Sequence, residues 1–369
     1  PEHAPVFCGR TRAIGDVLSL LRQRSEVGRS FVLITGMSGC GKSSLVQAGV
    51  LPVLVQPGVI EGVGLWRYSI FRPGDSAGDL FYGLATALLQ PTSLPELQAD
   101  GPSLDELAAT LRHDPAAACP LIKGALSQGA SHLAVAEDAA TQPEARLLLY
   151  VDQFEELFTR KSVTSDQQSA FASMLEALSA SHRVWIVATM RSDFFHRLAE
   201  VPELTALKEG GLYDLLPPNP EELAKIIRQP AAAAGLRFGE DPDTGARLDD
   251  VLRDAAAADP ASLPLLEFTL EELFRRSGDD RMLTMLDYES LGGVAGALWK
   301  RADETLETLP ESSRQQLRSV FRELVTIEDV RQQIPARRTA EFNRFRTESE
   351  RELVGAFVEA RLLTACLLY

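Results

Sequence analysis

The most constraining feature of this chain is the stretch from Phe31 to Gly49, FVLITGMSGCGKSSLVQAG. An apolar, β-forming run leads into a glycine-rich turn, and a helix-forming segment follows the turn. The turn has the spacing Gly36-x-x-x-x-Gly41-Lys42-Ser43, which is the P-loop pattern and is informative when a strand precedes it and a helix follows. Both flanks are present. The sequence therefore predicts a phosphate-binding loop between a strand and a helix.

Each residue type in this loop suits a triphosphate ligand. Glycines at positions 36, 39 and 41 would let backbone N–H groups approach the phosphates. Lys42 opens the helix and can reach the β- and γ-phosphates, while the Ser43 hydroxyl can bind Mg²⁺. We therefore expect ATP or ADP with Mg²⁺ as cofactors. The predicted binding residues of the loop are Gly36, Ser38, Gly39, Cys40, Gly41, Lys42, Ser43 and Ser44.

Acidic residues follow a second apolar run, RLLLYVD at 146–152. Such a run is typical of a parallel strand that is buried on both faces. At the carboxyl edge of the sheet Asp152 would lie beside the P-loop and bind Mg²⁺ directly or through water, although it could also be an ordinary strand-end acid. Glu155 and Glu156 follow within one turn, and either can orient the attacking water or simply occupy a solvated helix start. The sequence does not decide between the two glutamates.

The run RVWIVATM at 183–190 predicts the next buried strand, which brings Thr189 and Arg191 to the same edge of the sheet. Arg191 can contact the γ-phosphate; the alternative is an ion pair with Asp193 at a helix start. Near the N-terminus, the pair Gly9-Arg10 by itself indicates only a turn with a solvated arginine.

Other segments predict the rest of the architecture. Further strands are expected at 65–71 and 211–216, and loops at 91–103 and 131–144. The double proline at 217–218 marks a domain boundary, after which the pattern is helical for about eighty residues. A last strand is expected at 362–369. The expected helices cover residues 16–26, 79–90, 104–112, 116–129, 297–309, 312–325 and 350–361.

Composition narrows the classes of function. The net charge of −15 argues against a general nucleic-acid-binding surface. The four cysteines have neither paired spacing nor nearby histidine ligands, so neither a zinc site nor a disulfide framework is expected. No run of eighteen apolar residues indicates a membrane helix. These features favour a cytoplasmic protein with no membrane partner, and no histidine is assigned a catalytic role.

The motifs together resemble one family, the signal transduction ATPases with numerous domains (STAND), and in particular the bacterial novel-STAND NTPase group. The resemblance implies an α/β fold: a P-loop parallel sheet with helices on both faces at 1–217, an all-helical domain at 218–295 and an incomplete winged-helix domain at 296–369. It also implies that Arg10 lies near the adenine and Pro264 near the nucleotide. The stretches that carry it are FCGR, GMSGCGKSSLVQAGVLP, WRYSIFRPG, LLLYVDQFEELFT, IVATMRSDFF, SLPLLEFTLEEL and EARLLTA.

The resemblance also implies a function, in which the nucleotide acts as a switch. ADP would hold the domains closed, a sensed ligand would open them, and ATP would support a homo-oligomer that activates a fused effector, in bacterial signalling or antiphage defence. Slow ATP hydrolysis would reset the signal. Because the chain begins at Pro1 and the family's winged-helix histidine does not appear before Tyr369, we expect the sensor and effector domains to lie outside this sequence.

An alternative function is a DNA-associated loader ATPase, which also joins a P-loop domain to a winged helix. A basic face for DNA would have to come from arginines that stand amid nearby acids, and the acidic net charge makes nucleic acid the less favoured partner. A small-molecule kinase is a third possibility, but no acceptor site is visible. The arginines concerned are Arg331, Arg337, Arg338, Arg344 and Arg346.

Overall fold

The computed structural model describes residues 4–56, 58–76, 78–160, 162–259, 263–329, 334–337, 340, 342–360 and 362–363. By its packing the chain divides into two compact units, and the division falls within the helix at 248–258. The first unit contains the described residues among 1–235 and 256–263, and the second those among 236–255 and from 264 onward. The three domains expected at 1–217, 218–295 and 296–369 stay predictions.

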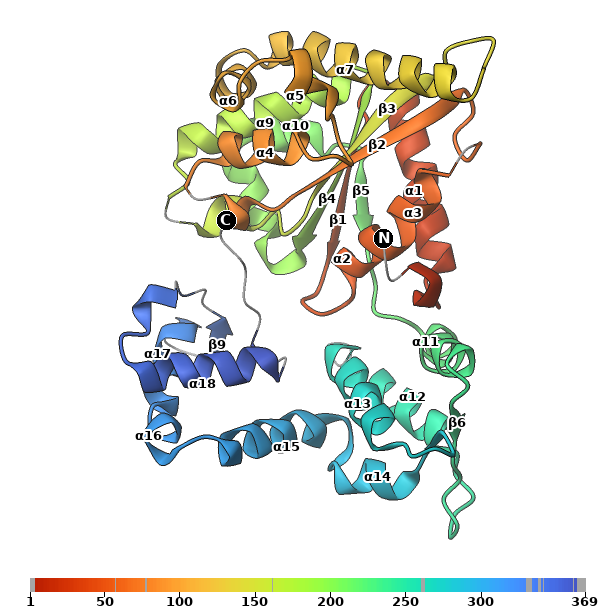
Figure 1. Cartoon of the computed structure of the whole chain (residues 1–369), viewed down its shortest axis with the longest axis vertical. Helices are drawn as coiled ribbons and strands as arrows, with labels where there is room; N and C mark the ends of the chain where they lie inside the picture. The colour runs from red at the N-terminus through yellow and green to blue at the C-terminus, as the bar shows by residue number, and fades with distance from the viewer. Residues whose placement is uncertain are drawn as a thin grey trace. The chain divides into compact units, whose positions relative to one another are not determined.

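The first unit is built on a five-stranded parallel sheet with the strand order β2-β3-β4-β1-β5 (Figure 1). Every residue of β1 is buried, as are nearly all residues of β3 and β4, which explains why these segments are continuous apolar runs. The predicted P-loop sheet is thereby confirmed. Its strands are β1 (Phe31–Gly36), β2 (Val63–Phe71), β3 (Glu144–Val151), β4 (Val184–Arg191) and β5 (Leu212–Asp214).

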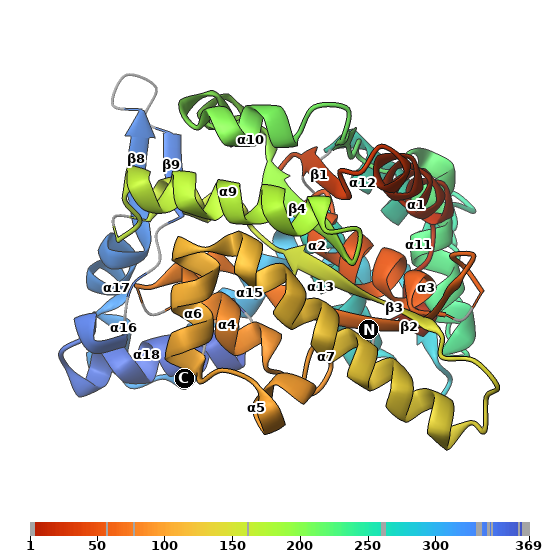
Figure 2. The ribbon, with the colours of Figure 1, turned by 90° about the horizontal axis from the view of Figure 1, so that it is seen from above.

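Helices cover both faces of this sheet, as predicted (Figure 1). On one face lie α1 (Thr11–Glu26), α2 (Lys42–Ser44), the π-helical stretch η2 (Leu45–Val50) and α3 (Leu51–Leu54). On the other face α6, α7 and α9 pack against one another (Figure 2). The helices of this second face are α4 (Leu80–Leu88), α5 (Glu96–Asp100), α6 (Leu104–His113), α7 (Pro115–Ala136), α9 (Ser165–Ala180) and α10 (Pro202–Leu207).

Shorter elements complete the first unit. They are η1 (Ala4–Val6), η3 (Pro73–Asp75), α8 (Glu156–Thr159) and η4 (Ser192–Glu200), together with the longer α11 (Pro220–Ala233). Helix α11 begins as the sequence predicts: the Asn219 side chain accepts from the backbone N–H of Glu222, and the Glu222 side chain accepts from the backbone N–H of Asn219.

Strand alternation decides which side chains reach the P-loop side of the sheet. In β3, Leu147, Leu149 and Val151 pack with the helices of the second face, while Leu148 and Tyr150 pack with α1 and η2. Because side chains alternate along a strand, the acid at position 152 continues the Tyr150 side. The sheet thus places this acid on the face that carries the P-loop helix.

Two predicted loops contain helix. The loop expected at 131–144 is wrong in its first part, because α7 continues to Ala136, and the loop expected at 91–103 contains α5. The sequence analysis ended the helix at Gly129, but this glycine serves close packing: a Cβ there would lie 2.6 Å from Oε1 of Glu96 in α5. Beyond it, leucine and alanine favour continued helix.

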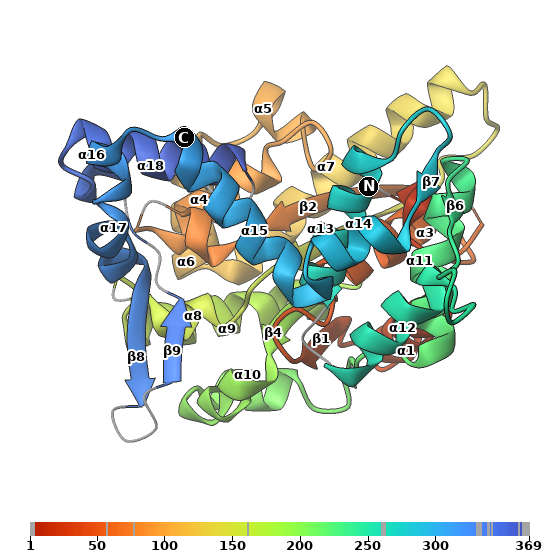
Figure 3. The ribbon, with the colours of Figure 1, turned by 90° about the horizontal axis from the view of Figure 1, so that it is seen from below.

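The second unit contains α12 (Leu248–Ala258) up to its residue 255, two small strand pairs and several further helices (Figure 3). The predicted helix at 312–325 is wrong at its end: it is divided into α16 and α17, and Val325 already belongs to β8, which pairs with β9 in antiparallel fashion. The parallel pair is β6 (Arg237–Phe238) with β7 (Met282–Leu283). The remaining elements are α13 (Leu263–Arg276, in the second unit from 264), α14 (Met285–Ser290), α15 (Gly293–Thr308), α16 (Glu311–Arg314), α17 (Leu317–Leu324), β8 (Val325–Asp329), β9 (Ile334–Arg337), η5 (Phe342–Arg344) and α18 (Glu348–Glu359).

A small apolar core joins α16, α17 and α18, with Val320 and Leu353 fully buried in it. Of the strand expected at 362–369, residues 364–369 lie outside the described residues. In the part of the chain that the structure describes, no helix is both long enough and apolar enough to cross a bilayer.

Candidate nucleotide-binding site

The glycine-rich turn between β1 and α2 has the backbone that its sequence predicts. Gly39 and Gly41 have φ angles of 79° and 89°, which residues with a side chain rarely adopt. Gly36 is needed for a different reason, since a Cβ there would lie 2.8 Å from both Sγ of Cys40 and the carbonyl oxygen of Leu215. The expectation that all three glycines serve the approach to phosphate is therefore refined: their absence of side chains first allows the loop itself to form.

Lys42 is the first residue of α2, and its ammonium lies over the loop. Nζ donates hydrogen bonds to the carbonyl oxygens of Gly36 at 2.9 Å and Met37 at 2.7 Å. These bonds hold a positive charge at the mouth of a turn whose tip is exposed, since Ser38 is a surface residue and so is Ser44 on the first helical turn. The arrangement suits an anionic ligand.

Asp152 is completely buried at the end of β3 and is bonded to the P-loop helix. Its Oδ1 accepts a hydrogen bond from the Ser43 hydroxyl at 2.8 Å. The same oxygen accepts from Tyr150 Oη at 2.7 Å, Thr189 Oγ1 at 2.7 Å and the backbone N–H of Gln153 at 3.1 Å. Burial by itself would raise the pKa of Asp152, but the hydrogen bonds outweigh it and hold the pKa below its ordinary value. The carboxylate is thus kept ionised.

Arg72 is a member of this site that the sequence analysis missed. Its NH2 donates to Oδ2 of Asp152 at 3.0 Å. The sequence analysis interpreted RPGDS at 72–76 only as a turn. The signal was available in principle, because Arg72 directly follows β2, but using it requires knowing that β2 lies beside β3 with Phe71 opposite Val151.

The structure separates the two glutamates that follow Asp152. Oε2 of Glu155 accepts from the backbone N–H of Arg191 at 3.2 Å, and the charge of Lys42 is close enough to act on this carboxylate. Burial raises the pKa of Glu155, although these neighbours oppose the shift. Glu155 therefore lies between the end of β4 and the P-loop lysine.

Glu156 points to the other side, toward the loop after β2. Burial raises its pKa to about 7, against the opposing effects of the Gly74 backbone and the charges of Arg72 and Arg160. Its Oε2 has no hydrogen-bond partner in the described part of the chain. A Cβ on Gly74 would collide with this carboxylate, so the glycine makes room for it.

Arg191 adopts the alternative that the sequence left open. Its Nε and NH2 contact the two carboxylate oxygens of Asp193 at 3.1 and 2.5 Å, and its guanidinium lies 5.2 Å from the centre of the Phe194 ring. The ion pair is partly exposed at the end of β4. A contact of Arg191 with a γ-phosphate stays a prediction.

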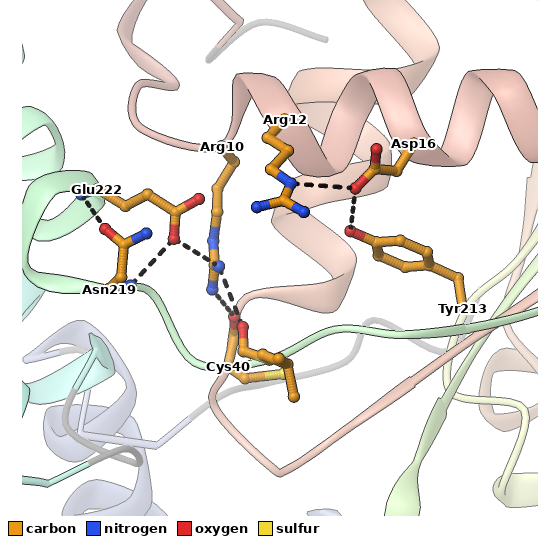
Figure 4. A network of polar contacts seen from close by, with 8 residues as sticks. Arg10, Arg12, Asp16, Cys40, Tyr213, Asn219 and Glu222 are labelled. Carbon is orange, nitrogen blue, oxygen red and sulfur yellow. Dashed lines mark hydrogen bonds and ion pairs between the residues drawn. The ribbon is translucent and has the colours of Figure 1, made fainter.

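Arg10 is buried and belongs to a polar network beside the P-loop (Figure 4). Its NH2 donates to the Cys40 carbonyl at 3.1 Å, and its NH1 donates to the Leu216 carbonyl at 3.0 Å and contacts Oε2 of Glu222 at 3.4 Å. The interpretation of Arg10 as a solvated arginine is therefore wrong. Its expected place near the adenine stays a prediction, as does that of Pro264, which belongs to the second unit.

The donor set fits a nucleotide with Mg²⁺. Ser43 and Asp152 supply a hydroxyl and a carboxylate within 2.8 Å of each other, and Mg²⁺ is commonly held by one or two such oxygens together with phosphates and water. The left-handed glycines and Lys42 supply the phosphate cradle. A P-loop between β1 and its helix, an acid at the end of β3 and a parallel sheet with β1 between β4 and β5 define a P-loop NTPase fold.

Comparison with known proteins gives the family. Residues 1–367 match the model of Novel STAND NTPase 1 (nSTAND1), and the chain belongs to this family. The predicted resemblance is thereby confirmed at the level of the family. No sequence among curated proteins matches the chain.

Solved structures show the same fold. The Aeropyrum pernix ORC1 protein, solved in complex with DNA, is 16% identical, with a TM-score of 0.51 over 98% of this chain and 85% of that chain. The A. pernix ORC2 protein has a TM-score of 0.49 and 15% identity over 82% of this chain and 71% of that chain. CDC6P from Pyrobaculum aerophilum has a TM-score of 0.43 and 15% identity over 95% and 80%.

Proposed function

We propose that this chain is a regulatory ATPase module that binds ATP and ADP with Mg²⁺ and changes its conformation and assembly with the nucleotide. Membership of a STAND-type P-loop NTPase family supports nucleotide binding. The observation that carries the proposal is the hydrogen bond between Ser43 Oγ and Asp152 Oδ1. It joins the P-loop helix to the acid of the neighbouring β-strand edge, which is the pair of groups that a nucleotide-bound Mg²⁺ requires.

In this proposal each group has a distinct task. The P-loop backbone and Lys42 would bind the β- and γ-phosphates, and Ser43 with Asp152 would hold the metal. When bound, Mg²⁺ neutralises charge on the phosphate oxygens. Tyr150 and Thr189 orient the Asp152 carboxylate, because both hydroxyl groups donate to its Oδ1.

We propose Glu155, rather than Glu156, as the residue that orients the attacking water. The carboxylate of Glu155 is under the influence of Lys42 and is held by the end of β4, whereas Glu156 faces Gly74, Arg72 and Arg160. A water at Glu155 would therefore lie on the phosphate side. Burial of this carboxylate raises its pKa toward neutrality, which makes it a better proton acceptor than an ordinary glutamate.

The switch itself is proposed from the family. A change of nucleotide can bias two domain arrangements only through contacts that differ between them. ADP would favour a closed monomer and ATP a homo-oligomer, in a longer protein with sensor and effector domains that acts in bacterial signalling or antiphage defence. Slow hydrolysis would limit the lifetime of the active assembly.

Calorimetric titration of ADP and ATP into this chain and into its Lys42→Ala variant tests the binding step. Loss of the charge-assisted phosphate contact should cost about 2–3 kcal/mol, or tens-fold to a hundredfold in ATP affinity. Lys42→Arg, which keeps the charge, should lose less. Equal ATP affinity of the wild type and Lys42→Ala would contradict the placement of the site.

Light scattering with ADP and with a non-hydrolysable ATP analogue tests the assembly step. A larger particle with the ATP analogue than with ADP is expected, and a single size in both would contradict the switch. A. pernix ORC1 was solved with DNA, so duplex DNA is a useful further ligand. Salt-sensitive retention of DNA would favour the loader alternative.

A further inference from the structure

The two oxygens of the Asp152 carboxylate have unequal surroundings. Oδ1 accepts from Ser43, Tyr150, Thr189 and the Gln153 backbone, which exceeds its two lone pairs. Oδ2 has one hydrogen-bond donor within the described residues, the NH2 of Arg72 at 3.0 Å. Oδ2 is therefore the oxygen at which a cation can bind, and a cationic side chain already lies there.

The position of Arg72 follows from the sheet. The backbone N–H of Asp152 donates to the carbonyl of Phe71 at 2.9 Å, so the residue after β2 lies directly beside the residue after β3. The Arg72 side chain is 30% exposed, whereas that of Asp152 is 1% exposed. The guanidinium thus lies between the buried carboxylate and the surface.

Arg72 also has other acids within electrostatic reach. Asp75 and Glu156 both interact with its charge, in addition to Asp152. The loop that follows does not depend on Arg72, since Arg160 donates to the carbonyl oxygens of Pro73 at 2.7 Å, of Ser76 at 3.2 Å and of Gly74. The guanidinium can therefore move from Asp152 to a second carboxylate while residues 73–76 stay in place.

We propose that Arg72 sets the metal affinity of the site by competing with the divalent cation for Oδ2 of Asp152. The inference rests on the proposed function and adds a residue to it. A cation that binds at Oδ2 either displaces the guanidinium or shares the oxygen with it, and in both cases the positive charge of Arg72 opposes metal binding. Arg72 is then a determinant of metal affinity and not a group that reacts with the nucleotide.

The test measures metal binding separately from catalysis. Affinity for metal-free ADP is determined first, and Mg²⁺, or Mn²⁺ followed by electron paramagnetic resonance, is then titrated into the ADP complex at constant ionic strength. The variants are Arg72→Gln and Arg72→Met, which remove the charge, and Arg72→Lys, which keeps it. Arg67→Gln is the matched control, because Arg67 lies on the same strand and pairs with Glu96 at 2.9 Å, away from Asp152.

Arg72→Gln and Arg72→Met should bind the metal at least about tenfold more tightly than the wild type, since a neighbouring positive charge is removed. Arg72→Lys and Arg67→Gln should stay within about threefold. The methionine variant keeps the packing of the side-chain stem, so either neutral variant that binds ADP gives an answer.

Three results separate the proposals. Failure of the wild type to bind ADP would remove the proposed function itself. Normal ADP binding with unchanged or weaker metal affinity in the neutral variants would overturn the competition and leave Arg72 as a residue that orients Asp152. Loss of metal-free ADP affinity in Arg72→Gln, restored in Arg72→Lys, would also overturn it, because Arg72 would then contact the phosphates.

Discussion

Ser43 Oγ and Asp152 Oδ1 lie 2.8 Å apart, although 109 positions separate the two residues in the chain. The short hydrogen bond exists because β1 and β3 flank β4 in one parallel sheet, so the loops after β1 and β3 emerge at the same edge. Both groups are positioned by backbone that is buried on two faces. The site is therefore formed by the core of the unit and not by a mobile surface loop.

Replacement of Asp152 by asparagine should remove the metal dependence of ADP binding. The amide keeps the size of the side chain but loses the charge, and its NH₂ group faces donors that the carboxylate accepted. Metal-free ADP affinity should change by less than about threefold, whereas the additional affinity given by Mg²⁺ should disappear. Calorimetry with and without Mg²⁺ measures both quantities, and Asp166→Asn, at an exposed helix start, is the control. A full Mg²⁺ effect in Asp152→Asn would show that the metal lies elsewhere.

Glutamine at position 155 should slow ATP cleavage more than glutamine at position 156. Orientation and polarisation of a nucleophile is worth roughly 10²–10⁴ in rate, and only Glu155 lies on the side of Lys42. Single-turnover cleavage of ATP by the two variants gives a direct comparison, with ATP affinity measured in parallel as the control for folding. The assignment fails if Glu156→Gln is the slower variant, and near-wild-type rates in both would exclude either carboxylate from the reaction.

The stability of the protein should fall between about pH 4 and pH 7 because of Glu156. Its pKa is about 7 in the folded protein and roughly 4.3 in an unfolded chain. The folded state therefore binds the proton more tightly, so this contribution is fully present below the unfolded pKa and is lost as the pH rises through the folded pKa. After allowance for partial solvent access the loss is about 1–2 kcal/mol.

Urea unfolding at pH 5 and pH 8 measures this effect. Glu156→Gln should reduce the pH dependence and be the more stable protein at pH 8, because it never carries the buried charge. Glu137→Gln, at an exposed position after α7, should leave the pH dependence unchanged. Parallel pH profiles of the wild type and Glu156→Gln would mean that another group titrates in this range. Glu155, whose pKa is also raised, is the next candidate.

Replacement of Glu222 by glutamine should destabilise the first unit by about 1–3 kcal/mol, because the buried guanidinium of Arg10 would lose its charged partner. Glu221→Gln is a close control, since Glu221 lies in the same helical turn and is exposed. Its effect should be below about 0.5 kcal/mol. Chemical unfolding of both variants in the absence of nucleotide measures the difference. Equal effects would show that the Arg10 network contributes little to stability.

Much of the fold could be predicted because its strands are covered on both faces. The runs FVLITG and RLLLYV are apolar at successive positions, and only a strand in the middle of a layered sheet requires this. Helix ends were harder to predict, as α7 shows: Gly129 looked like a stop signal, but it is a contact point for Glu96. A glycine that ends a helix and a glycine that packs inside one have the same letter in the sequence.

The site was predictable where one motif contains the chemistry and not where the sheet creates it. Lys42, Ser43 and Asp152 each follow from local patterns. Arg72 became visible only with the strand order, because nothing near position 72 in the sequence indicates an acid at position 152. The choice between Glu155 and Glu156 likewise depended on which side of the strand end each side chain takes.

One oxygen of Glu222 has two structural tasks. Oε2 accepts the backbone N–H of Asn219 at 3.0 Å, which begins α11, and it also contacts the guanidinium of Arg10 at 3.4 Å (Figure 4). A force that pulled α11 away from the P-loop would therefore act on the ion pair and on the first turn of the helix together. Under such tension the connection should break in a single step at a threshold load, and a pulling experiment should record a sharp rupture rather than gradual extension.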